Sequence, residues 1–142
     1  MAQDPNPLKL FQIEEPEGAP EAADGFGMAV GIELSRHGAS LAAAIGGNAE
    51  WLIAPEPGGI MAAPGEPALA ELLRGLRAAA EKALARPVTH AVIRLDNGIE
   101  IADVVLLRAA AAADIALLGI RRDGSALDAA IEAEDLVAIL SN

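Results

Sequence analysis

The pattern of hydrophobic and polar positions changes its period midway along the chain. Apolar runs come first and predict three short strands, at residues 26–34, 40–45 and 50–54. Turn-forming residues separate these runs, at 35–39 and 46–48. Short strands joined by turns of this length favour an antiparallel meander.

A helical period follows the meander. Between Leu69 and Leu84, apolar residues recur at the i, i+3, i+4 and i+7 positions of a helix. Pro67 suits the first turn of this helix, and Pro87 ends it. The remaining pattern predicts a strand at 88–95, a helix at 100–113 and a buried strand at 115–120.

The last segment begins with the signature of a helix start. Ser125 is suited to cap a helix that begins near Ala126, and Asp128 stands three residues on, in the capping-box position. Residues 134–140 either continue this helix or form a strand. The predicted order is three strands, then helix, strand, helix, strand and helix.

Residues 1–24 differ in composition from the rest of the chain. They contain four prolines, and their six acidic residues face a single Lys9. Such a segment buries too little apolar surface to offset the entropy of ordering it. The sequence therefore predicts a flexible tail at 1–24 and one domain at 25–142, with a short apolar docking element at 8–13 that packs on the domain or on a partner.

Charge and composition exclude several classes of function. The net charge is −11, and phosphate backbones and anionic membranes both require a basic surface, so neither nucleic acid nor a membrane is an expected partner. The chain has no cysteine, which excludes thiolate chemistry and fits a reducing cytoplasm. The longest apolar stretch, 101–120, is interrupted by charged residues and does not predict a membrane span.

The order of elements is that of the ribonuclease-H-like α/β plan, and local segments sharpen the resemblance. Val30-Gly31-Ile32-Glu33-Leu34 is similar to the V-G-I-D-L strand that opens the seventy-kilodalton heat-shock chaperones, which belong to the actin-like ATPases. Residues 79–93 resemble their A-E-x-x-L-G-x-P-V-x-x-A-V-I stretch. Weaker likenesses follow in the same order along the chain, at 40–44, 50–59 and 115–126. The resemblance implies the first lobe of such an ATPase.

This resemblance also shows departures at the catalytic positions. Glu33 stands where the family has its metal-facing aspartate, and Asp123 stands at its catalytic glutamate. Ser35-Arg36-His37-Gly38 replaces the glycine-threonine-threonine phosphate loop, whose small residues allow close backbone approach to phosphate. The catalytic lysine of the lobe has no counterpart, and the second lobe, which supplies the adenine pocket, is missing.

Two kinds of site remain open at these positions. Glu33 and Asp123, at the carboxyl ends of neighbouring strands, would supply oxygen ligands for Mg²⁺. Five other residues are candidate contacts for ATP phosphates: Ser35, Arg36, His37, Ser40 and Ser125. In the alternative interpretation these carboxylates and hydroxyls are solvated strand-end and turn residues, and no metal or catalytic residue is present.

The other chemistry-bearing residues give weaker signals. His37 beside Ser35 or Ser40 is a possible acid–base pair without a third orienting group, and His90 fits a hydrogen-bonded packing position in its strand. Arg121-Arg122 either bind an anion or offset Asp123. The stretch 120–124 with 134–140 also resembles the C-terminal ligand domain of bacterial potassium-uptake regulators, which would make 134–140 a strand and the domain a small-ligand sensor.

The departures favour a non-catalytic function. A lobe without its mate exposes the face that normally lines the nucleotide cleft, and such a face is usually covered. The sequence therefore predicts a chaperone-like interaction module that forms a homodimer or binds a protein partner. The alternatives are a Mg-dependent nucleotide-binding or phosphohydrolase domain and a small-ligand sensor.

Overall fold

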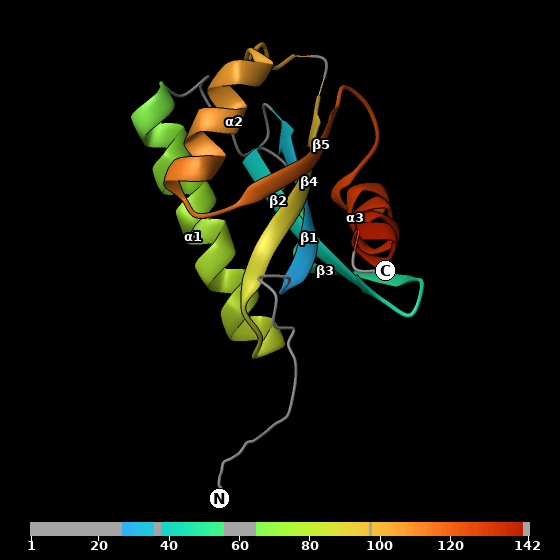
Figure 1. Ribbon diagram of the computed structural model, residues 1–142. Helices are drawn as coiled ribbons and strands as arrows, with labels where there is room; N and C mark the ends of the chain where they lie inside the picture. The colour runs from blue at the N-terminus through green and yellow to red at the C-terminus, as the bar shows by residue number, and fades with distance from the viewer. Residues whose placement is uncertain (1–26, 36–37, 56–64, 97, 141–142) are drawn as a thin grey trace, which may run out of the picture.

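The computed structural model describes residues 27–35, 38–55, 65–96 and 98–140. They form an α/β structure in which three strands precede alternating helices and strands (Figure 1). The elements are β1 (Met28–Ser35), β2 (Gly38–Ile45), β3 (Asn48–Ile53), α1 (Glu66–Leu84), β4 (Val88–Leu95), α2 (Asp103–Ala112), β5 (Ala116–Arg121) and α3 (Ala126–Leu140). The predicted α/β class and the order of the helices and strands are confirmed.

The five strands form one mixed sheet in the order β3-β2-β1-β4-β5. β1, β2 and β3 pair antiparallel, as the predicted meander requires, while β4 lies parallel to β1 and β5 parallel to β4. The carboxyl ends of β1, β4 and β5 therefore lie at the same edge of the sheet. This edge brings together the ends of three strands that are far apart in the sequence.

Helices cover both faces of the sheet. α1 and α2 lie together on one face, and α3 lies alone on the other (Figure 1). The larger core fills the space under α1 and α2 with buried aliphatic residues such as Leu69, Leu73, Ile93 and Leu106. The buried hydrophobic residues of the described part of the chain are all alanine, valine, leucine and isoleucine, so this core is aliphatic.

α3 packs against the sheet through small residues. Ala126, Ala129, Ala130 and Ala133 are fully buried on its inner face. Opposite them is Gly31 of β1, where a Cβ would lie 2.2 Å from the carbonyl oxygen of Ala126 and 2.3 Å from the amide nitrogen of Ala130. The helix backbone therefore approaches the sheet more closely than any side chain at Gly31 would allow.

The β2–β3 hairpin is fastened to α3. Gly46 and Gly47 both have positive φ angles, 63° and 84°, which L-residues with a side chain rarely adopt. Their amides donate hydrogen bonds of 2.7 and 2.8 Å to the two carboxylate oxygens of Glu134. One side chain of α3 thus holds the tip of a hairpin that is distant in sequence.

Two helix boundaries correct the sequence prediction. The helix predicted from Glu100 begins only at Asp103, because Ile99 and Ile101 are buried in the core and the Ile99 amide closes a turn onto the Asp96 carbonyl at 2.9 Å. Residues 134–140 belong to α3, so the strand interpretation of this segment is wrong. The resemblance to the potassium-uptake regulators required that strand and loses its support.

The predicted tail at 1–24 and its docking element at 8–13 lie outside the described residues. Within the described part of the chain, no helix is long and apolar enough to cross a membrane.

Candidate functional site

Polar side chains meet where β1 and β4 end, beneath the start of α3. Glu33 of β1 is flanked in the sheet by Ser40 of β2 and by Arg94 of β4. The Ser40 hydroxyl is buried and donates a hydrogen bond of 3.4 Å to Oε1 of Glu33. These three side chains emerge on the face that α3 covers, because neighbours in register point to the same side of a sheet.

Arg94 is the centre of this group. Only 15% of its side chain is exposed, and its Nη1 donates to the main-chain oxygen of Asp123 at 2.8 Å. The same nitrogen lies 3.4 Å from the Asp123 carboxylate, and Nη2 lies 3.2 Å from Oε1 of Glu132 on α3. The other carboxylate oxygen of Glu132 pairs with Arg121 at the end of β5. The guanidinium therefore joins β4, the β5–α3 loop and α3.

Gly124 makes room for Arg94. It has a φ of +87°, and a Cβ at this position would lie 2.4 Å from Nη1 of Arg94. The glycine of the Asp123-Gly124 turn therefore serves both the backbone conformation and the close approach of the guanidinium. Nε of Arg94 is buried without a hydrogen-bond partner.

The two carboxylates predicted to hold Mg²⁺ lie on either side of this arginine. Arg94 is the register neighbour of Glu33 and the ion-pair partner of Asp123. The Asp123 side chain is 91% exposed and points into solvent beside the guanidinium. Among the residues that the structure describes, no three His, Cys, Asp or Glu side chains gather in a way that would hold a metal ion.

Ser125 performs the capping role that the sequence predicts. Its hydroxyl accepts a hydrogen bond of 3.3 Å from the Asp128 amide, while the Asp128 carboxylate lies 3.1 Å from the Ser125 amide. The same carboxylate accepts from the Ser125 hydroxyl at 3.3 Å. The capping box at the start of α3 is confirmed, and it occupies the hydroxyl that was a candidate phosphate contact.

The candidate phosphate loop is only partly described. The Ser35 hydroxyl donates to the main-chain oxygen of Gly38 at 3.2 Å, across the narrow turn between β1 and β2. Arg36 and His37 lie outside the described residues. Ser35 and Ser40 are thus placed in local hydrogen bonds within the meander.

His90 lies in the middle of β4, away from this group. Its Nδ1 is 2.6 Å from the Thr89 hydroxyl oxygen. The same oxygen accepts a hydrogen bond of 2.8 Å from the Gly27 amide. Burial lowers the pKa of His90 below its ordinary value. These contacts agree with the interpretation of His90 as a packing histidine.

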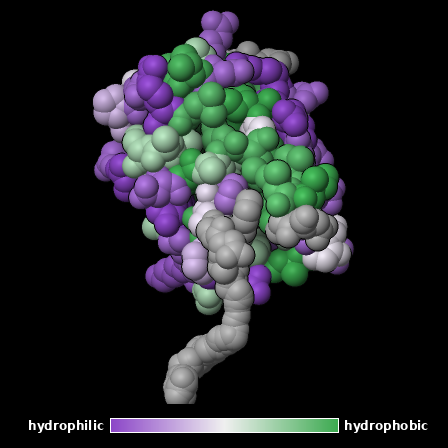
Figure 2. Space-filling view, in the orientation of Figure 1, coloured by the Kyte–Doolittle hydropathy of each residue, from purple (hydrophilic) through white to green (hydrophobic). Residues whose placement is uncertain are grey.

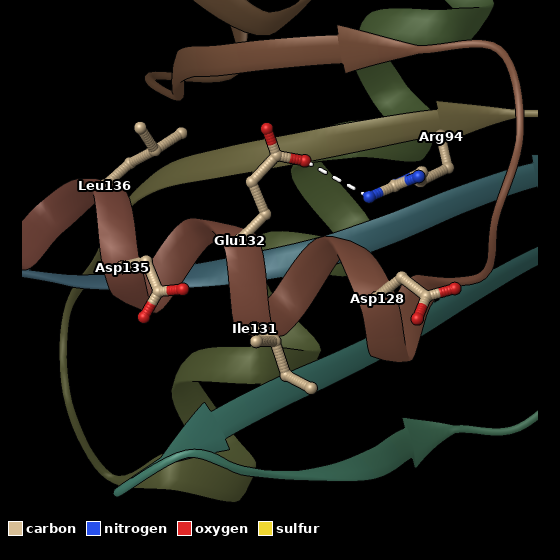
Figure 3. Close-up of a pocket in the computed structure, with 6 residues that line it drawn as sticks. All are labelled: Arg94, Asp128, Ile131, Glu132, Asp135 and Leu136. Atoms are coloured by element: carbon tan, nitrogen blue, oxygen red, sulfur yellow. Dashed lines mark hydrogen bonds and ion pairs between the residues drawn. The ribbon is translucent and has the colours of Figure 1, made fainter.

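A shallow hollow of 440 Å³ opens beside Arg94 on the α3 face. Its walls are Arg94 and five residues of α3, namely Asp128, Ile131, Glu132, Asp135 and Leu136 (Figure 3). Glu132 points from the helix toward Arg94, whereas Ile131 projects from the other side of the helix (Figure 3). Three carboxylates line the hollow and one cation faces them, so it does not suit an anionic ligand such as ATP.

The roles of Arg94 and Glu132 were not expected from the sequence. Arg94 is the one residue of its strand that is charged at neutral pH, which is a usable signal for a paired charge. The sequence instead predicts that Arg121 and Arg122 offset Asp123. Arg122 binds the Asp103 carboxylate at 2.7 Å, and Asp123 is bound by Arg94.

The chain matches no known protein-family model, and no curated protein is similar to it in sequence.

Proposed function

We propose that this protein is a non-catalytic interaction domain built on the ribonuclease-H-like plan, resembling the first lobe of an actin-like ATPase. The strand order β3-β2-β1-β4-β5, with helices after β3, β4 and β5, supports that plan. So does the split of the helices, with two on one face of the sheet and one on the other.

The position of Arg94 carries the non-catalytic half of the proposal. In a phosphoryl-transfer site, the carboxylates at these strand ends hold a divalent cation that bridges the phosphates. Here a fixed guanidinium, 15% exposed, stands beside Glu33 and binds Asp123. A second cation at the same place would be repelled by the first and would find Asp123 already paired.

The neighbouring polar groups support the same conclusion. The Ser125 hydroxyl serves the cap of α3, and the Ser40 hydroxyl is directed to Glu33. A phosphate would have to displace these internal hydrogen bonds. The exposed apolar side chains of the domain, among them Val104, Leu107 and Ile139, are the kind of surface through which a binding module acts.

Calorimetric titration with ATP and Mg²⁺ tests the proposal. We expect no heat of binding and no phosphate release, because Arg94 takes the place of the metal. Arg108→Gln, which changes an exposed arginine far from Glu33, is the matched control for Arg94→Gln in the same titration. Magnesium-dependent hydrolysis that Glu33→Ala or Asp123→Ala abolishes would replace this proposal with the phosphohydrolase alternative.

A further inference from the structure

β5 forms one outer edge of the sheet, and its middle is apolar. Within the described part of the chain, nothing pairs with the side of β5 that faces away from β4. The other edge strand, β3, exposes the polar Asn48 and Glu50 beside Trp51, whereas in β5 the half-buried Leu117, Leu118 and Ile120 stand together without a charged residue among them. An unpaired edge with apolar side chains is a template for an added strand.

The surface around β5 has the same character. Hydrophobic residues gather over the middle of the face on which β5 lies, with polar residues around the rim (Figure 2). α2, which contacts β5, exposes Val104 at 53% and Leu107 at 48%. A partner strand on β5 would therefore also find apolar neighbours beyond the backbone ladder.

The carboxyl end of β5 places two guanidinium groups at this edge. The side chains of Arg121 and Arg122 are 44% and 53% exposed, although each already binds one internal carboxylate. A guanidinium has five N–H donors, so both arginines can donate hydrogen bonds to a second carboxylate. The strand that suits β5 is therefore apolar first and acidic at its end, when it runs parallel to β5.

The chain itself contains such a sequence. Leu10-Phe11-Gln12-Ile13-Glu14-Glu15 matches Leu117-Leu118-Gly119-Ile120-Arg121-Arg122 position by position, with each arginine answered by a glutamate. Residues 10–15 lie outside the described residues. We propose that β5 binds residues 10–15 of a second copy of this chain as a parallel sixth strand, and that reciprocal exchange of these segments forms a homodimer. This inference rests on the proposed function as an interaction domain, and it identifies the partner as a second copy of the chain.

The regular part of β5 includes the first of the two charged pairs in this arrangement. The register between β4 and β5 shifts at Leu118, between the pairs Ala91–Leu117 and Val92–Gly119. From Gly119 to Arg121 the pairing with β4 is regular, so this part presents an even row of main-chain groups. Gln12, Ile13 and Glu14 would lie against it.

The length of the connection favours a second copy over the same molecule. Residues 16–26 would have to return from the carboxyl end of β5 to Gly27, at the amino end of β1. The twelve residue-to-residue steps from Glu15 to Gly27 span roughly 40 Å when the chain is fully extended. The route covers about 20 Å along β5 and about 14 Å across three strand spacings, and it must also pass around the sheet edge or a helix, so it uses most of that length. A neighbouring copy has no such limit, and a twofold exchange closes without further growth.

Sedimentation equilibrium of the full chain with a proline pair tests the added strand. Phe11→Pro with Gln12→Pro removes two consecutive amides from residues that are not part of the described fold. We expect the parent to be a dimer and this variant to dissociate with a constant raised about tenfold or more. Ala22→Pro with Ala23→Pro is the matched control and keeps the dimer. A monomeric parent, or a proline variant that dimerises like the parent, would overturn the proposal.

A charge exchange tests the register and the second copy together. Glu14→Lys with Glu15→Lys places cations opposite Arg121 and Arg122, and Arg121→Glu with Arg122→Glu places anions opposite Glu14 and Glu15. We expect each variant alone to be a monomer and their equimolar mixture to form a one-to-one heterodimer, because both exchanged pairs are then attractive. Failure to form the heterodimer, while circular dichroism shows both chains folded, contradicts the proposal. A wild-type chain in which residues 10–15 pair with β5 of the same molecule also contradicts the proposal.

The result is independent of the test for catalysis. Magnesium-dependent ATP hydrolysis with an intact heterodimer would remove the non-catalytic assignment and leave the strand exchange standing. Absence of both hydrolysis and dimer would leave the non-catalytic assignment and remove the strand exchange.

Discussion

At the scale of single residues, Gly31 determines how closely α3 approaches the sheet. The atoms that a Cβ would meet are the backbone of Ala126 and Ala130, at 2.2 and 2.3 Å, so no side-chain rotation relieves the clash. We expect Gly31→Ala to lower the free energy of unfolding by about 1–3 kcal/mol, as overpacking of a close-packed core does. Urea unfolding followed by circular dichroism measures this.

Gly75 of α1 provides the control for that substitution. It is exposed, and a Cβ there would meet nothing within 4 Å. Gly75→Ala should raise the free energy of unfolding by about 0.5–1 kcal/mol through helix propensity alone. If Gly31→Ala is as stable as the parent or more stable, as expected for Gly75→Ala, the close contact between α3 and β1 is refuted.

His90 links stability to pH. Its pKa in the folded state is lowered by burial from the ordinary value of 6.5, so the unfolded chain binds the proton more readily. The contribution of His90 to stability is therefore complete above pH 6.5 and is lost as the pH falls from 6.5 toward the folded-state pKa. We expect His90→Gln to lose stability less steeply than the parent over this window, measured by urea unfolding at several pH values. His37→Gln is the control, and equal slopes for the two variants would contradict the assignment.

The elements themselves were predicted well where the signal is local. The helical period from Leu69 and the proline at 87 define α1, and the apolar run at 88–95 coincides with β4. The start of α2 was missed because burial of Ile99 and Ile101 decides it, and burial depends on elements distant in sequence. The extent of α3 was left open because its inner face consists of alanines, which mark neither a strand nor a helix strongly.

Glu134 connects two elements through one carboxylate. It accepts both amides of the Gly46-Gly47 turn, and an amide side chain offers only one acceptor atom. We expect Glu134→Gln to cost about 0.5–1.5 kcal/mol and to speed hydrogen exchange at Gly46 and Gly47. Exchange at Val92, in the centre of the sheet, should change much less. Asp135→Asn is the matched control on the same helix, and faster exchange in that variant as well would contradict the specific role of Glu134.

At the scale of the whole molecule, the candidate site was predicted in part. Glu33 and Asp123 lie at the carboxyl ends of β1 and β5, at the same edge of the sheet, whereas Ser40 lies near the amino end of β2. The prediction that the strands of Glu33 and Asp123 are neighbours is wrong, because β4 lies between them. What the sequence did not reveal is that Arg94 stands between the two carboxylates. That requires the register of β1 against β4, which long-range packing sets and no local pattern encodes.

Folding and self-association should separate when residues 1–24 are removed. The described residues contain a buried core of their own, so a chain of residues 25–142 should still unfold cooperatively by circular dichroism. The thermal midpoint of the full chain should rise with protein concentration, because dimerisation stabilises the folded state by mass action, whereas that of the shortened chain should not. A glycine–serine segment of equal length in place of residues 1–24 controls for the loss of a long acidic extension and should behave like the shortened chain. Concentration dependence that survives in the shortened chain would show that the copies associate through another surface, and failure of that chain to fold would show that residues 1–24 belong to the core.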